Sequence, residues 1–112
     1  MREPTKSVKH ALRRLSAVAH EEELRRALLP VATAFEEWRA GRLDSGELTE
    51  RIHDFHQGPA RELFKRYYSG SLEYAVAQAI VGGVLDRMTV PAEVLEHCKA
   101  AIELLEGAPR SD

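Results

Sequence analysis

Apolar residues recur at intervals of three and four along almost the whole chain, and this spacing constrains the fold more than any other feature. Such a period places the apolar side chains on one face of an α-helix. No segment shows the sustained two-residue alternation that is typical of a half-buried β-strand. The sequence therefore predicts an all-α protein.

Capping residues, glycines and prolines divide this pattern into five or six helices. A basic first helix is expected over about residues 5–19, and a second helix from Glu21 to the stop at Gly41. Pro30 lies inside the second helix, but the apolar pattern continues in register past it, which favours a kink over an end. Because no glycine or proline separates the first two helices, a single bent helix is the alternative.

The next signals predict a compact helical hairpin. Asp44 and Glu47 have the spacing of a capping box at the start of a third helix, and Gly58 is expected to end that helix. Pro59 then opens a fourth helix at its first turn. A loop this short between the second and third helices implies that the two run antiparallel.

Residues 72–88 are apolar nearly all round, which predicts a buried helix at the centre of the bundle. Within it, Ala75, Ala79 and Gly83 recur every four residues and would form a ridge of small side chains. Another helix, from this chain or from a second copy, can approach such a ridge closely. A last helix is expected from about residue 91, and residues 107–112 are expected to fray. We predict one domain over residues 1–112.

The charge of the chain is unevenly distributed. Its 112 residues carry a formal net charge of −2, yet residues 1–20 carry a net charge of +4. This asymmetry is typical of an arm that docks on an acidic partner, although the same cations can also pair with the protein's own acidic helices. The cations of the predicted first helix are candidate contacts for a protein or a nucleic acid: Lys6, Lys9, Arg13 and Arg14.

The compartment is expected to be the cytoplasm. Cys98 is the single cysteine, so an intramolecular disulfide cannot form, and the first residues lack the apolar core of a signal peptide. The longest apolar run falls well short of the roughly 20 residues needed to cross a bilayer. We therefore expect no association with the membrane.

One motif suggests an enzyme. Arg51-Ile-His-Asp-Phe-His56, in a helical domain of about this length, resembles the HEPN superfamily. That resemblance, which covers only this motif and the helical class, implies a metal-independent ribonuclease of the toxin or phage-defence type. His56 would move a proton of the ribose hydroxyl, and Arg51 would stabilise the phosphate. Ile52 departs from the polar residue that the family prefers there, and the alternative is that both residues border an apolar stripe.

Two further clusters contain residue types that can bind a ligand. Glu50, His53 and Asp54 share a helix face as metal ligands do, but the second copy of the motif that such sites use is missing, so a solvated polar face is the preferred interpretation. We expect neither metal nor cofactor.

Lys65 and Arg66 precede two tyrosines, a mixture that is typical of single-strand nucleic-acid binding. The same tyrosines also continue an apolar stripe and can instead pack in the core.

These observations favour a non-enzymatic helical module that binds a protein, either as a homodimer or as an accessory subunit. The ridge in residues 72–88 and the basic first helix are the two features that support it. The ribonuclease with Arg51 and His56 is the first alternative, and a nucleic-acid-binding helical protein is the second.

Overall fold

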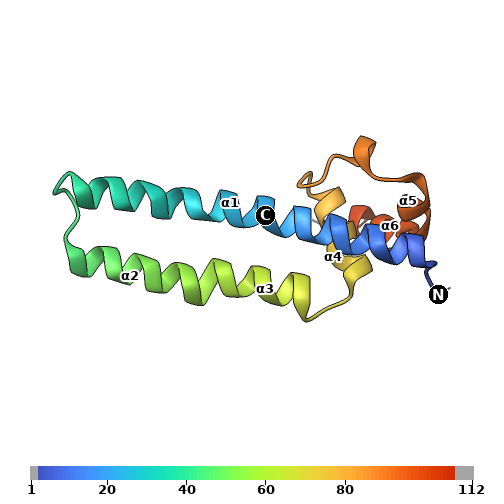
Figure 1. Ribbon diagram of the computed structural model, residues 1–112, viewed down its shortest axis with the longest axis horizontal. Helices are drawn as coiled ribbons and strands as arrows, with labels where there is room; N and C mark the ends of the chain where they lie inside the picture. Colours follow the sequence, from blue (N-terminus) through green and yellow to red (C-terminus); the bar gives the residue numbers. More distant parts are fainter. Residues whose placement is uncertain (1–2, 108–112) are drawn as a thin grey trace.

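A computed structural model describes residues 3–107, and over this range it contains helices and no strand, which confirms the all-α fold (Figure 1). The predicted tail lies outside the described residues from 108 onward, while Gly107 is the last residue of the final helix. The elements in chain order are α1 (Lys6–Arg39), α2 (Ser45–Phe55), the π-helical turn η1 (His56–Ala60), α3 (Arg61–Tyr68), α4 (Leu72–Val81), the 3₁₀ turn η2 (Arg87–Thr89), α5 (Ala92–His97) and α6 (Lys99–Gly107).

The first two predicted helices are one continuous helix. As predicted, α1 starts at Lys6, and the Thr5 hydroxyl caps it by accepting a hydrogen bond from the Val8 N–H. The expected boundary near residue 19 is absent, because no residue there prevents the backbone from continuing its hydrogen bonds. Pro30 lies inside α1, and the helix ends before Gly41, which adopts a left-handed φ of 80°.

A second arm, formed by α2, η1 and α3, runs back along α1 (Figure 1). Its start is as predicted, since Asp44 Oδ1 accepts a hydrogen bond from the Glu47 N–H at 2.8 Å. The expected break at Gly58 is wrong, because the chain passes through it in the π-helical turn. Pro59 has no N–H to donate, and a wider turn accommodates the missing bond without ending the arm.

The central helix α4 is buried as predicted, but it is shorter than the expected 72–88. It stops at Val81, because Gly83 adopts a φ of 76° and the N–H groups of residues 84 and 85 both bond the Ala79 carbonyl. Ala75 and Ala79 are buried inside the chain. Gly83 lies outside the helix in the turn, so it does not belong to the predicted ridge.

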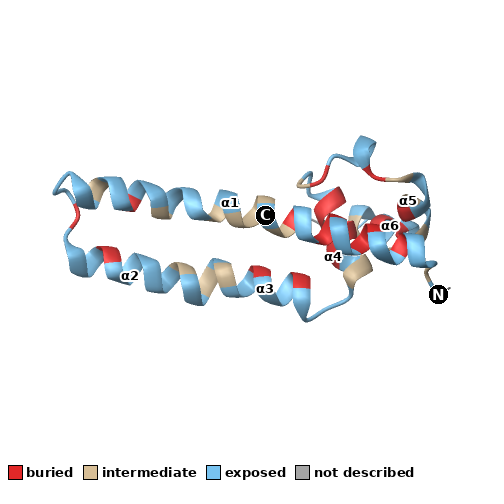
Figure 2. Cartoon of the chain, in the orientation of Figure 1, coloured by how far each residue is buried: buried red, intermediate tan, exposed pale blue. Residues whose placement is uncertain are grey.

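The main core lies where the first half of α1 meets α4 and α5, with α6 packed on α4, and the two-armed hairpin extends beyond it (Figure 2). The dimensions of the molecule, 55 × 32 × 25 Å, reflect this projection. The outer hairpin has a separate small cluster of buried apolar residues, Ala34, Leu43 and Leu48. Each hairpin arm is therefore covered mainly by the other arm. None of the described helices combines the length and the apolar character needed to cross a membrane.

The two leucines Leu12 and Leu29 of α1 test this division. Leu12 is 1% exposed in the core and Leu29 is 62% exposed on the hairpin. We expect Leu12→Ala to lower the free energy of unfolding by about 3 kcal/mol, because it leaves a cavity. Leu29→Ala should change it by about 0.5 kcal/mol or less. Urea unfolding followed by circular dichroism measures both, and equal losses would contradict the assignment of the core to the first half of α1.

Candidate functional site

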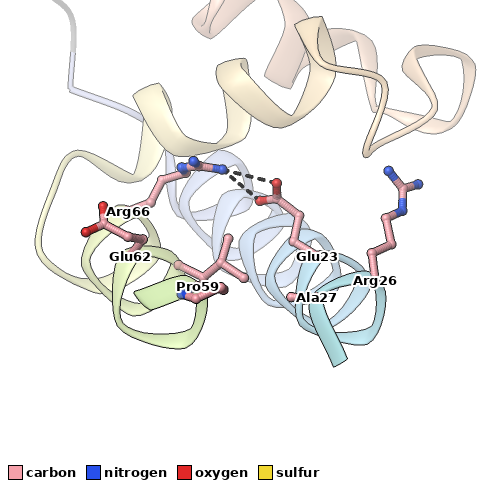
Figure 3. Close-up of a pocket in the computed structure, with 7 residues that line it drawn as sticks. Glu23, Arg26, Ala27, Pro59, Glu62 and Arg66 are labelled. Atoms are coloured by element: carbon pink, nitrogen blue, oxygen red, sulfur yellow. Dashed lines mark hydrogen bonds and ion pairs between the residues drawn. The ribbon is translucent and has the colours of Figure 1, made fainter. Parts of the chain in front are cut away.

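One side of the hairpin is charged, and Arg26, Arg66 and Glu23 on it form ion pairs within the molecule. A hollow of about 410 Å³ lies between α1 and the returning arm. Figure 3 shows the side chains that line it: Glu23, Arg26, Ala27, Pro59, Glu62, Leu63 and Arg66. Arg66 Nη1 donates to both carboxylate oxygens of Glu23 at 3.1 Å. Arg26 pairs with Glu22 at 3.2 Å. We call Glu23, Arg26, Glu62 and Arg66 the charged flank.

Glu23 also fixes the buried tyrosine of α3. The Tyr67 hydroxyl donates a hydrogen bond to Glu23 Oε2 at 2.5 Å. Burial of the hydroxyl, together with the carboxylate beside it, raises the pKa of Tyr67 well above its ordinary value. Because Glu23 is on α1 and its two partners are on α3, this network joins the two arms. The polar atoms of Glu23, Arg66 and Tyr67 are occupied by one another, so these three residues stabilise the fold and offer little to a ligand.

The other side of the hairpin is apolar. Four large side chains there are each between 40% and 44% exposed: Leu28, Phe35, Trp38 and Ile52. We call these four residues the apolar flank. Leu28, Phe35 and Trp38 follow one another at helical spacing on α1, and the rings of Phe35 and Trp38 meet edge to face at 6.4 Å.

Trp38 connects this set to the second arm. Its Nε1 donates to the Ser45 hydroxyl at 3.0 Å, and Ile52 follows Ser45 by two turns on the same side of α2. The apolar period of the sequence predicts one apolar face on each helix. This face is only partly covered on the hairpin, because no third element packs on this side among the described residues.

Arg51 and His56 do not meet within the chain. Arg51 lines a hollow with Pro30 of α1 and with Asp54, whereas His56 lines a different hollow with Phe64. Both residues are exposed, and their five-residue separation places them on different sides of the helix.

The second polar cluster of α2 lies in solvent. Glu50, His53 and Asp54 are all exposed. Over residues 3–107, no three side chains of His, Cys, Asp or Glu are close enough together to hold a metal ion.

The predicted basic residues fall into two groups. Four of them form an exposed set on the first half of α1, opposite its buried face, and no described carboxylate lies within 4.0 Å of their nitrogen atoms: Lys6, Lys9, Arg13 and Arg14. We call this set the basic stripe. On α3, Lys65 is exposed, whereas Arg66 is held by Glu23.

The two tyrosines of α3 separate as well. Tyr67 is buried, as the core interpretation predicts, but Tyr68 is 62% exposed and packs against Phe64, which is 57% exposed, at 5.1 Å. The apolar stripe of the sequence predicts that both tyrosines can pack in the core, and this holds for Tyr67 alone. Consecutive residues lie about 100° apart around a helix, so the burial of Tyr67 turns Tyr68 toward solvent.

Comparison with protein-family profiles, curated proteins and solved structures gives no match for this chain.

Cys98 is a core thiol. Its side chain is 1% exposed and lies 3.9 Å from the Glu73 carbonyl. Burial, and secondarily the Glu73 carboxylate, raises the pKa of the thiol to about 11. A thiol in this environment is protonated at neutral pH and is a poor nucleophile.

We expect Cys98 of the native protein to react with an aromatic disulfide reagent at pH 8 at least about 100-fold more slowly than Cys98 of the urea-unfolded protein. In the native protein the reagent cannot reach the sulfur, and the thiol is not ionised to the reactive thiolate. The release of the reagent's coloured thiol measures the rates. Similar rates in the two states would contradict the buried placement.

Proposed function

We propose that this protein is a non-enzymatic interaction module that forms a homodimer through the apolar flank of its hairpin. The observation that carries the proposal is the exposure of four large apolar side chains on one side of a two-helix projection whose other side is charged. Aromatic and aliphatic side chains of this size, exposed to this degree, leave roughly 300 Å² of apolar surface in water. Patches of a few hundred Å² commonly mark interaction sites.

The exposed apolar area of the flank is large enough for an interface with a second copy of the chain. A stable interface buries about 800 Å² on each partner, a little over half of it apolar. The apolar flank supplies most of that apolar share, and exposed neighbours such as Ala32 and Thr49 extend it. Two hairpins that pack flank to flank would complete a four-helix bundle, in which each apolar stripe is covered.

The charges at the two ends of the flank favour an antiparallel arrangement. Glu21 and Arg39 are 18 residues apart on α1, which is about five turns, so both lie on the same edge of the helix as Leu28. A two-fold axis near residue 30 would place Glu21 of one copy beside Arg39 of the other. Glu21 is held only by an exposed contact of 3.8 Å to Arg25, and Arg39 forms no ion pair with a described residue.

Substitution at the centre of the flank tests the dimer. We expect Ile52→Glu to weaken self-association at least about tenfold, because a two-fold interface buries the unpaired carboxylate twice. Leu29→Glu is the matched control, since Leu29 is exposed but lies outside the flank. Light scattering over a concentration series measures the mass. A wild-type monomer at all concentrations would contradict the proposal, as would equal effects of the two substitutions.

The antiparallel register has its own test. Arg39→Glu should weaken the dimer about fivefold, because it places like charges together at both symmetric contacts. The double variant Glu21→Arg with Arg39→Glu should recover most of the loss, since each pair is then restored with its signs exchanged. Sedimentation equilibrium at low salt gives the three dissociation constants. Failure of the double variant to recover would reject this register and leave the Ile52 result as the separate test of the dimer.

A further inference from the structure

We propose that the basic stripe and the neighbouring aromatic pair, Phe64 and Tyr68, form a binding site for single-stranded nucleic acid. This site shares no residue with the apolar flank, and the argument for it does not rest on the proposed dimer. Two kinds of group that single strands need are brought together here from distant parts of the chain, cations for the phosphates and exposed rings for the bases.

The cations are available for an anionic ligand. Between Pro4 and His20 the sequence holds no acidic residue, and the four stripe residues form no ion pair with a described carboxylate. The next carboxylates on α1 already have partners, since Glu21 contacts Arg25 and Glu23 contacts Arg66. The stripe therefore presents an excess of positive charge along a rigid helix.

His20 connects the stripe to the aromatic pair. It lies seven residues after Arg13, which is about two turns, so both are on the same side of α1 about 10 Å apart along the axis. The ring of Tyr68 meets His20 edge to face at 5.2 Å, and Phe64 packs on Tyr68. The exposed rings are thus placed at the end of the stripe, and Lys65 beside them on α3 adds a further exposed cation.

The same geometry argues against other anionic partners. A membrane-bound helix inserts its apolar face, but the apolar face of this half of α1 is buried under α4 and α5. An acidic peptide would use the cations and leave the rings without a role. A duplex hides the faces of its bases, so stacking on Tyr68 requires a single strand. From Lys6 to His20 the site spans about 21 Å, enough for a few nucleotides.

The test uses the full chain and a labelled oligo-uridylate of about 10 nucleotides. Fluorescence anisotropy should show binding that weakens as salt rises. The double variant Lys9→Gln with Arg13→Gln should weaken binding about tenfold and make the slope of log affinity against log salt shallower by about 1.4, the equivalent of two phosphate contacts. Tyr68→Ala should weaken binding at least about fivefold with an unchanged slope, because stacking is not electrostatic.

A matched control variant loses the same two positive charges at positions outside the proposed site. Arg42→Gln with Lys99→Gln removes two exposed cations outside the site and should leave the affinity within about twofold. Circular dichroism confirms that each variant is folded. Absence of binding, equal effects of the two double variants, or an unaffected Tyr68→Ala variant would overturn the proposal.

Two further probes address competing ligands. Tighter binding to the same sequence as a duplex, or to phosphatidylcholine–phosphatidylserine vesicles, would also overturn the proposal. Because Ile52 is not part of the site, Ile52→Glu should still bind the oligo-uridylate. Failure of the dimer and failure of this site are therefore distinguishable.

Discussion

The uninterrupted course of α1 determines how much of the molecule can be covered. Its first half packs against α4 and α5, where Leu12 and Ala19 are buried. Its second half extends beyond those helices and is accompanied by one returning arm. An apolar stripe on a helix is about 100° wide or more, and a single antiparallel neighbour cannot cover all of it. The apolar flank follows from the length of α1 relative to the rest of the chain.

The network of Glu23, Arg66 and Tyr67 determines which side stays open. It lies where the core ends and the hairpin begins, and it joins α3 to α1 through an ion pair, in which one nitrogen of Arg66 contacts both carboxylate oxygens of Glu23, and through the Tyr67 hydroxyl. Two partners from α3 on one carboxylate of α1 restrict the distance between the two arms. With one side of the hairpin closed by its own charges, the opposite side carries exposed Phe35 and Ile52. The fold thus separates internally satisfied polar groups from unsatisfied apolar ones.

The two proposed surfaces are compatible on one molecule. The basic stripe lies on the first half of α1, and the apolar flank lies on its second half and on α2. An antiparallel dimer through the flank would bring the second halves of α1 together and would place the two basic stripes at opposite ends of the assembly. Binding of a single strand would then occur twice for each dimer without competition from the interface. This arrangement suits a module that links or spaces its ligands.

Local interactions made much of the fold predictable from the sequence: Thr5, Asp44 and Ser71 cap helices as their side chains allow, and the apolar period determined the all-α class. The ends of helices were less predictable. The sequence near Ala19 and the pair Gly58-Pro59 only weakly favour a helix end, and the packing of the surrounding elements decides whether the helix continues. The sequence also predicted the basic stripe, because the helical spacing of basic residues is enough to place them on one exposed side of a helix. Only the tertiary structure decided that Tyr67 is buried and Tyr68 exposed, and that Trp38 remains partly in water. Burial depends on which elements pack on a helix face. The spacing of apolar residues in the sequence specifies the face but not the elements that pack on it.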